Sequence, residues 1–267
     1  MQILKQFGDV VDYKTGIITA ISVVITYIFY TYQITSDIPG NLIGVAVVFP
    51  IVFAINSAYR RREDALSELA SMRANAMAMF YIHRDWVKED REEHASRIRT
   101  LNLALFRTLK DYLVADEEKE NELLLLQIYQ HFSDMSESFE YLREAGIIGA
   151  GMARVNIYHQ NMMRSFENIR NIYIYRTPIS LRAYTTVLLY FFPIIFSPYF
   201  ALLGQKHFLL AGIGVSIVYS VVLVSLSNVQ DNLEKPFDGI GQDDIRFDEF
   251  DVYEQVMSQM PSSPSKE

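Results

Sequence analysis

The sequence predicts an all-α membrane protein in which four transmembrane helices, arranged as two hairpins, bracket an interleaved cytoplasmic helical layer. Two observations predict this fold class. Long uncharged apolar runs lie near both ends of the 267-residue chain, and the stretch between them repeats apolar residues every three or four positions, as amphipathic helices do. Half of the residues are hydrophobic, yet the formal net charge is −8, so one part is expected in the bilayer and another in water.

Composition excludes several classes of protein. Cysteine is absent, which excludes disulfides, thiolate metal sites and cysteine nucleophiles. The acidic balance argues against nucleic-acid binding, which needs Lys and Arg clustered on one face. Because no HExxH, GxSxG or P-loop motif occurs, we expect no enzyme.

The first hairpin is expected to consist of residues 16–34 and 41–58. The first run has nineteen successive uncharged residues, enough to cross roughly 30 Å of hydrocarbon as a helix. A cleaved signal peptide is the alternative, but no small-residue cleavage site follows the run. Residues 35–40 contain Asp, Pro and Gly and predict a tight turn. The second run is expected to pass straight into a charged helix.

Positive charges predict the topology. Arg60, Arg61 and Arg62 follow the second run directly, and Lys5 and Lys14 flank the first run. By the positive-inside rule, both ends of this hairpin are cytoplasmic. With four spans the N- and C-termini are both expected in the cytoplasm, and the cell (inner) membrane is the expected location.

Residues 65–175 are expected to form the cytoplasmic helices. The apolar spacing predicts four of them, at about 65–86, 95–114, 121–142 and 155–173. An acidic cluster at 116–122 and a Gly-rich joint at 146–151 separate neighbouring helices. Since this layer is interleaved between the spans, we expect residues 1–267 to be a single unit.

The second hairpin is expected to consist of residues 183–203 and 208–228, both uncharged. Pro193 and Pro198 predict kinks in the third span. Residues 204–207 are long enough only for a turn. A cytoplasmic C-terminal segment at 229–259 and a disordered tail at 260–267 complete the chain.

Three apolar residues of the second span share one line along a helix. Val45, Phe49 and Phe53 are four residues apart, so their side chains lie on one face. The stripe could face lipid or pack in a core. The stripe could instead line a pore. The four helices of one chain are too few to enclose a pore, so a pore would need a symmetric ring of copies. A ring of Phe side chains excludes water and ions when it is narrow and passes ions when it widens.

Two charged clusters have alternative interpretations. Arg60, Arg61 and Arg62 are either topology anchors, which the positive-inside rule favours, or a charge that attracts anions to a cytoplasmic vestibule. Near the C-terminus, Asp243 and Asp244 lie in a Gly-containing acidic stretch. Oxygen ligands of this kind suit calcium, although the spacing is not that of an EF-hand, and a solvated acidic tail is the alternative.

Three short stretches resemble one family. They are FAINSAYRRREDA at Phe53 to Ala65, RTPIS at Arg176 to Ser180 and NLEKPFDG at Asn232 to Gly239. These stretches, with two hairpins around a helical body, are similar to the bestrophins and their bacterial homologues. The resemblance extends over nearly the whole chain.

The resemblance implies a homopentamer in the lipid bilayer that conducts small inorganic ions, with anions such as chloride expected. It places the hydrophobic neck at Val45, Phe49 and Phe53, and a second, cytosolic constriction at Ile148 or Ala150. A neck of Val and Phe does not select by the sign of a fixed charge, so anions and cations both remain open. The alternative is a non-conducting membrane scaffold whose cytoplasmic helices bind a partner.

The sequence departs from the family pattern at two places. Arg62 and Glu63 stand where the family has an aromatic pair, and Asp238 stands where it has Gly. The calcium clasp of the animal members is matched only approximately, by Asp243 and Asp244, and bacterial homologues lack the clasp. The resemblance therefore implies no required cofactor.

Overall fold

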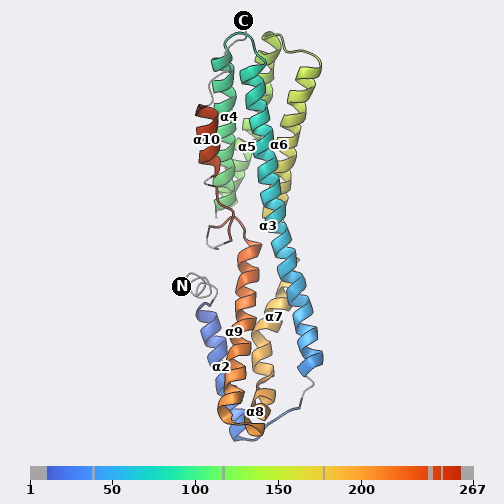
Figure 1. Ribbon diagram of the computed structural model, residues 1–267, viewed down its shortest axis with the longest axis vertical. Helices are drawn as coiled ribbons and strands as arrows, with labels where there is room; N and C mark the ends of the chain where they lie inside the picture. The colour runs from blue at the N-terminus through green and yellow to red at the C-terminus, as the bar shows by residue number, and fades with distance from the viewer. Residues whose placement is uncertain are drawn as a thin grey trace. The chain divides into compact units, whose positions relative to one another are not determined.

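The computed structural model describes residues 11–37, 40–115, 118–176, 178–239, 243–247 and 249–259, and all regular secondary structure in these ranges is helical. It describes only the backbone of residues 40–48, 118, 119, 181, 249 and 259. The predicted tail at 260–267 lies outside the described residues. The helices (Figure 1) are α2 Tyr13–Thr31, α3 Gly40–Asp85, α4 Arg91–Val114, α5 Glu118–Glu144, α6 Ala150–Ile174, α7 Ile179–Ile195, α8 Ser197–Lys206, α9 Leu209–Glu234 and α10 Glu249–Gln259.

The chain divides into two compact units. The first unit comprises Met1–Arg61 and Arg176–Lys235, and the second comprises Arg62–Tyr175 and Pro236–Glu267. Helices α2, α7, α8 and α9 belong to the first unit, and α4, α5, α6 and α10 to the second. Helix α3 contributes residues to both.

Three segments of the described chain have the length and apolar composition of membrane spans: Tyr13–Thr31, Arg182–Lys206 and Leu209–Glu234. They coincide with three of the four expected spans. The remaining span, at 41–58, is helical as part of α3. That it crosses a membrane stays a prediction, because many of its side chains lie outside the described residues.

The first unit buries hydroxyl groups and exposes apolar side chains. All three residues that α2 buries carry hydroxyls, whereas Val24 and Tyr27 are more than half exposed. The Ser22 hydroxyl of α2 donates to the Pro193 carbonyl at 2.9 Å and lies 2.8 Å from the Ser216 hydroxyl of α9. This arrangement suits lipid surroundings, where small and polar residues join helices and apolar side chains face outward.

The third span is interrupted at Phe196, between α7 and α8. Proline lacks an N–H group, so Pro198 cannot donate to the carbonyl of Ile194 four residues earlier. The Pro193 carbonyl accepts hydroxyl bonds from Ser22 and Ser197. Phe196 keeps backbone angles of φ −85° and ψ −1°, close to helical, so the prolines distort the third span at one residue, as the sequence predicts.

The turn before the last span is shorter than expected. Helix α8 continues to Lys206 and α9 starts at Leu209, so the prediction of a turn from residue 204 was wrong. The reason is close packing of α8 against α9 at two glycines. A Cβ atom on Gly212 would lie 2.4 Å from the Phe200 carbonyl oxygen and 3.0 Å from the backbone nitrogen of Gly204.

The second unit confirms the amphipathic pattern. Helix α3 runs without interruption to Asp85, and α4, α5 and α6 lie where periodicity placed helices. The side chains at three- and four-residue spacing are buried together. This core includes Met72, Met79, Phe80, Ile98, Leu105, Leu109, Ile128, Met135, Phe166 and Ile169.

Helix α10 was not predicted from the sequence. It packs on α4, where the Phe250 ring stacks on Phe106 with centroids 4.9 Å apart. The Arg107 guanidinium forms an ion pair with Glu254 at 2.9 Å. The acidic residues of this stretch suggested a solvated segment, but Phe250 and Met257 are buried at its ends.

One core position is occupied by a histidine. His83 of α3 is fully buried, and neither ring nitrogen has a hydrogen-bond partner among the described residues. Its ring centroid lies 6.4 Å from that of His94. Burial, with smaller contributions from His94 and Arg97, lowers the pKa of His83 from 6.5 to about 3.

We expect His83 to make the second unit sensitive to acid. The unfolded chain takes up a proton at this residue below pH 6.5, whereas the folded chain does so only near pH 3. Folding stability therefore falls as the pH drops from 6.5 to 3, by about 4 kcal/mol in total. Thermal unfolding of His83→Leu should show a smaller loss over this range than the parent, and the exposed-site control His207→Leu should match the parent. An equal loss in all three proteins contradicts the assignment.

Candidate functional site

The predicted neck residues lie on the outward side of α3. Phe49 and Phe53 are 58% and 63% exposed, and their rings stack with centroids 6.3 Å apart. The opposite side of the helix is packed, since Ile51 is 2% exposed and Ala54 is fully buried. The first unit therefore does not use the two Phe side chains as core. The Val45 side chain lies outside the described residues.

Packing on the opposite side explains this orientation. Ile51 joins a cluster with Leu189 and Phe192 of α7, Phe200 of α8 and Leu223 of α9. Each residue turns about 100° around a helix, so residues two positions from Ile51 point to nearly the opposite side of α3. Phe49 and Phe53 are therefore turned out of the bundle. The same periodicity continues the outward face through Asn56 and Arg60, seven and eleven residues beyond Phe49, and both are exposed.

The structure separates the three consecutive arginines. Arg60 is exposed and forms no ion pair within the described part of the first unit. Arg61 is partly buried, and burial lowers the pKa of its guanidinium while the charge of Glu234 opposes this effect. Arg62 forms an ion pair with Glu63 at 2.7 Å and donates from Nε to the Asp243 carbonyl. Only Arg60 continues the outward face of the two Phe residues.

A buried carboxylate was missed in the sequence analysis. Glu234, at the end of α9, is 3% exposed. Its carboxylate lies 3.4 Å from the Arg182 guanidinium of α7 and accepts a hydrogen bond from Gln230 at 3.2 Å. With the nearby charge of Arg61 in the middle of α3, these contacts bring together charged groups of α3, α7 and α9. The sign of this buried carboxylate in the sequence is a Glu that follows the apolar run of the fourth span.

The residues proposed for the cytosolic constriction lie at the joint between α5 and α6. Ile148 is 74% exposed and Ala150, the first residue of α6, is also exposed. Ile147 is buried and anchors the joint. Gly149 has φ +60°, a conformation that glycine adopts without strain. Ile148 is thus presented outward from a fixed loop.

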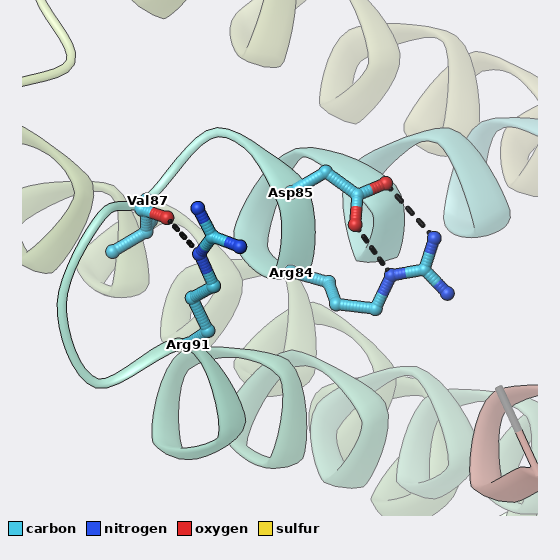
Figure 2. Close-up of polar contacts among 4 residues, drawn as sticks. All are labelled: Arg84, Asp85, Val87 and Arg91. Carbon is cyan, nitrogen blue, oxygen red and sulfur yellow. Dashed lines mark hydrogen bonds and ion pairs between the residues drawn. The ribbon is translucent and has the colours of Figure 1, made fainter. Parts of the chain in front are cut away.

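The end of α3 supports this joint from within the second unit. A Cβ atom on Gly151 would lie 3.7 Å from Cζ3 of Trp86, and the Arg154 guanidinium lies 6.0 Å from the centre of the Trp86 ring. Figure 2 shows the adjoining turn between α3 and α4. There Arg84 pairs with Asp85 at 2.6 Å, and Arg91 Nε donates to the Val87 carbonyl at 2.8 Å.

Asp243 and Asp244 do not fit a calcium ion in the described surroundings. Calcium takes six to eight oxygen ligands, mostly from carboxylates and carbonyls. The Asp243 carbonyl is bound by Arg62, and Arg73 and Arg246 line the same cavity. The described residues contain no group of three or more acidic or histidine side chains that could hold a metal ion. Three guanidinium groups repel a divalent cation.

No protein-family model matches the sequence, and no curated protein matches it. Two solved variants of a bacterial bestrophin homologue from Klebsiella pneumoniae are similar in structure, with TM-scores of 0.78 and 0.73 at 16% and 17% identity. Each comparison covers 92% of this chain and 97% of the other. The chain has a bestrophin-like fold. A further structure, of a membrane protein, has a TM-score of 0.76 at 17% identity and covers 95% of this chain and 98% of that one.

The bestrophin-like fold confirms the family resemblance at the level of structure. It extends over more than nine tenths of the chain, so the three short motifs correctly indicated one arrangement of helices. At such low identity the bestrophin-like fold alone does not establish an activity.

Proposed function

We propose that this protein is a homopentameric ion channel of the bilayer, in which α3 of each copy lines a central pore. The observation that carries the proposal is the exposure of Phe49 and Phe53 on a helix whose other side is packed. Around a fivefold axis these side chains would form two rings, and Val45 a third. Apolar rings block ions by dewetting when narrow and pass them when dilated.

Anions such as chloride are the proposed ions. Arg60 is exposed on the same helical face as Phe49 and Phe53, so five copies would place a ring of positive charge beside the neck. Such a ring attracts anions and repels cations. Ile148 or Ala150 would form the second, cytosolic constriction. Both termini would lie in the cytoplasm, with the channel in the cell (inner) membrane as one bestrophin-like unit.

The test is reconstitution of the purified full chain in liposomes under a potassium chloride gradient. We expect a fivefold particle by mass measurement and a reversal potential close to that of chloride. A reversal potential at the potassium value would reject anion selectivity and leave conduction intact. A monomer, or a pentamer with flux equal to that of empty liposomes, would reject the channel and favour the non-conducting scaffold.

A further inference from the structure

A cavity of about 350 Å³ lies in the second unit between α3 and the segment that leads into α10. Three arginines, two aspartates and several apolar side chains line it. The apolar wall includes Leu69 of α3 and Phe250 of α10, which are 3% and 8% exposed. A concave site that combines apolar side chains with a few charged groups is typical of small-molecule binding sites.

The arginines in this cavity have different roles. Arg62 is held by Glu63 and by the Asp243 carbonyl. Arg73 places its guanidinium 5.4 Å from the centre of the Tyr253 ring. Arg246 is exposed and forms no ion pair among the described residues that surround it. Its planar fork of donors matches a carboxylate in two-point geometry.

We propose that this cavity binds a small organic carboxylate with an aromatic or aliphatic body. The carboxylate would pair with Arg246, near the guanidinium of Arg73, and the apolar body would lie against Leu69, Phe247 and Phe250. A divalent cation is disfavoured by the three guanidinium groups, and a purely inorganic anion would make no use of the apolar side chains in the lining.

Binding would fasten the C-terminal segment to α3. The cavity is lined by Leu66 and Leu69 on one side and by residues 243–247 and Phe250 on the other. A ligand that contacts both sides stabilises the arrangement in which they face each other, by mass action. The site thus gives the second unit a means of sensing a small carboxylate. This inference does not depend on ion conduction.

The experiment measures thermal unfolding of the full chain in detergent with increasing sodium phenylacetate at constant ionic strength. Sodium acetate, which lacks the ring, phenylacetamide, which lacks the charge, and calcium chloride are the matched probes. We expect a saturable rise of the unfolding temperature with phenylacetate and a much smaller effect of the other three. Equal effects of phenylacetate and phenylacetamide would overturn the proposal, as would stabilisation by calcium alone.

Variants localise the effect to the cavity. Loss of a charge-assisted pair should raise the apparent Kd for phenylacetate at least about tenfold in Arg246→Gln. The exposed Arg164 of α6 supplies the control Arg164→Gln, which should bind as the parent does. If Arg246→Gln does not fold, Arg246→Lys keeps the charge, loses the two-point geometry and should bind more weakly. Unchanged binding in the folded Arg246 variant would overturn the site.

Discussion

Simultaneous replacement of Phe49 and Phe53 by alanine should raise resting ion flux in liposomes by at least about tenfold. Each tenfold change corresponds to a barrier lower by about 1.4 kcal/mol. The rings of Phe49 and Phe53 side chains would lose their bulk, so the passage would be wider and less apolar. Water would remain in it, and the closed state would no longer exclude ions. The two side chains make little contact with the core of their own unit, since both are more than half exposed. The double variant should therefore fold and assemble.

The matched control is Phe191→Ala on α7. Phe191 is 56% exposed, nearly the same as Phe49, but lies on a different helix of the first unit. If it faces lipid, flux should equal that of the parent. Measurements of chloride efflux and of single-channel open probability distinguish the two variants. Unchanged flux and gating in the Phe49 and Phe53 variant would show that these residues do not form the gate.

Replacement of Arg60 by glutamate should shift the reversal potential towards that of cations. In a pentamer the change would alter the local charge by ten units around the pathway, and the effect should be larger at low ionic strength, where the screening length is longer. We expect the anion-to-cation permeability ratio to fall by at least about tenfold, equivalent to ~1.4 kcal/mol. Arg60→Gln should have an intermediate effect.

The adjacent arginine provides the control for this experiment. Arg62 is held by Glu63 and the Asp243 carbonyl, so Arg62→Gln should lower thermal stability and leave the permeability ratio nearly unchanged. If Arg62→Gln shifts the reversal potential and Arg60→Glu does not, the outward face of α3 has been assigned to the wrong arginine. Reversal potentials at two salt concentrations distinguish these outcomes.

Much of the fold followed from periodicity, and the errors arose where packing decided the boundaries. The helices with clear apolar spacing were confirmed, including the uninterrupted α3. Helix α10 was missed because its stability depends on contacts with α4, such as Phe250 on Phe106. The turn before α9 was placed too early, because the approach of Gly212 to α8 is a contact between helices that the sequence does not display.

The candidate site was only partly predictable for the same reason. Spacing placed Phe49 and Phe53 on one face, and the family resemblance proposed a neck there. The sequence could not distinguish Arg60 from Arg61 and Arg62, since three adjacent arginines have the same chemistry. Glu234 was overlooked because its importance comes from burial beside Arg182 and Gln230.

The sequence by itself determined which residues share a face of each helix, because the 3.6-residue repeat depends only on local geometry. It also determined which stretches are apolar enough to span a bilayer. Only the tertiary structure decided which face of α3 is packed and which is free. That choice depends on Leu189, Phe200 and Leu223, which form one buried cluster with Ile51 although they lie far along the chain. Because they bury Ile51, they leave Phe49 and Phe53 exposed.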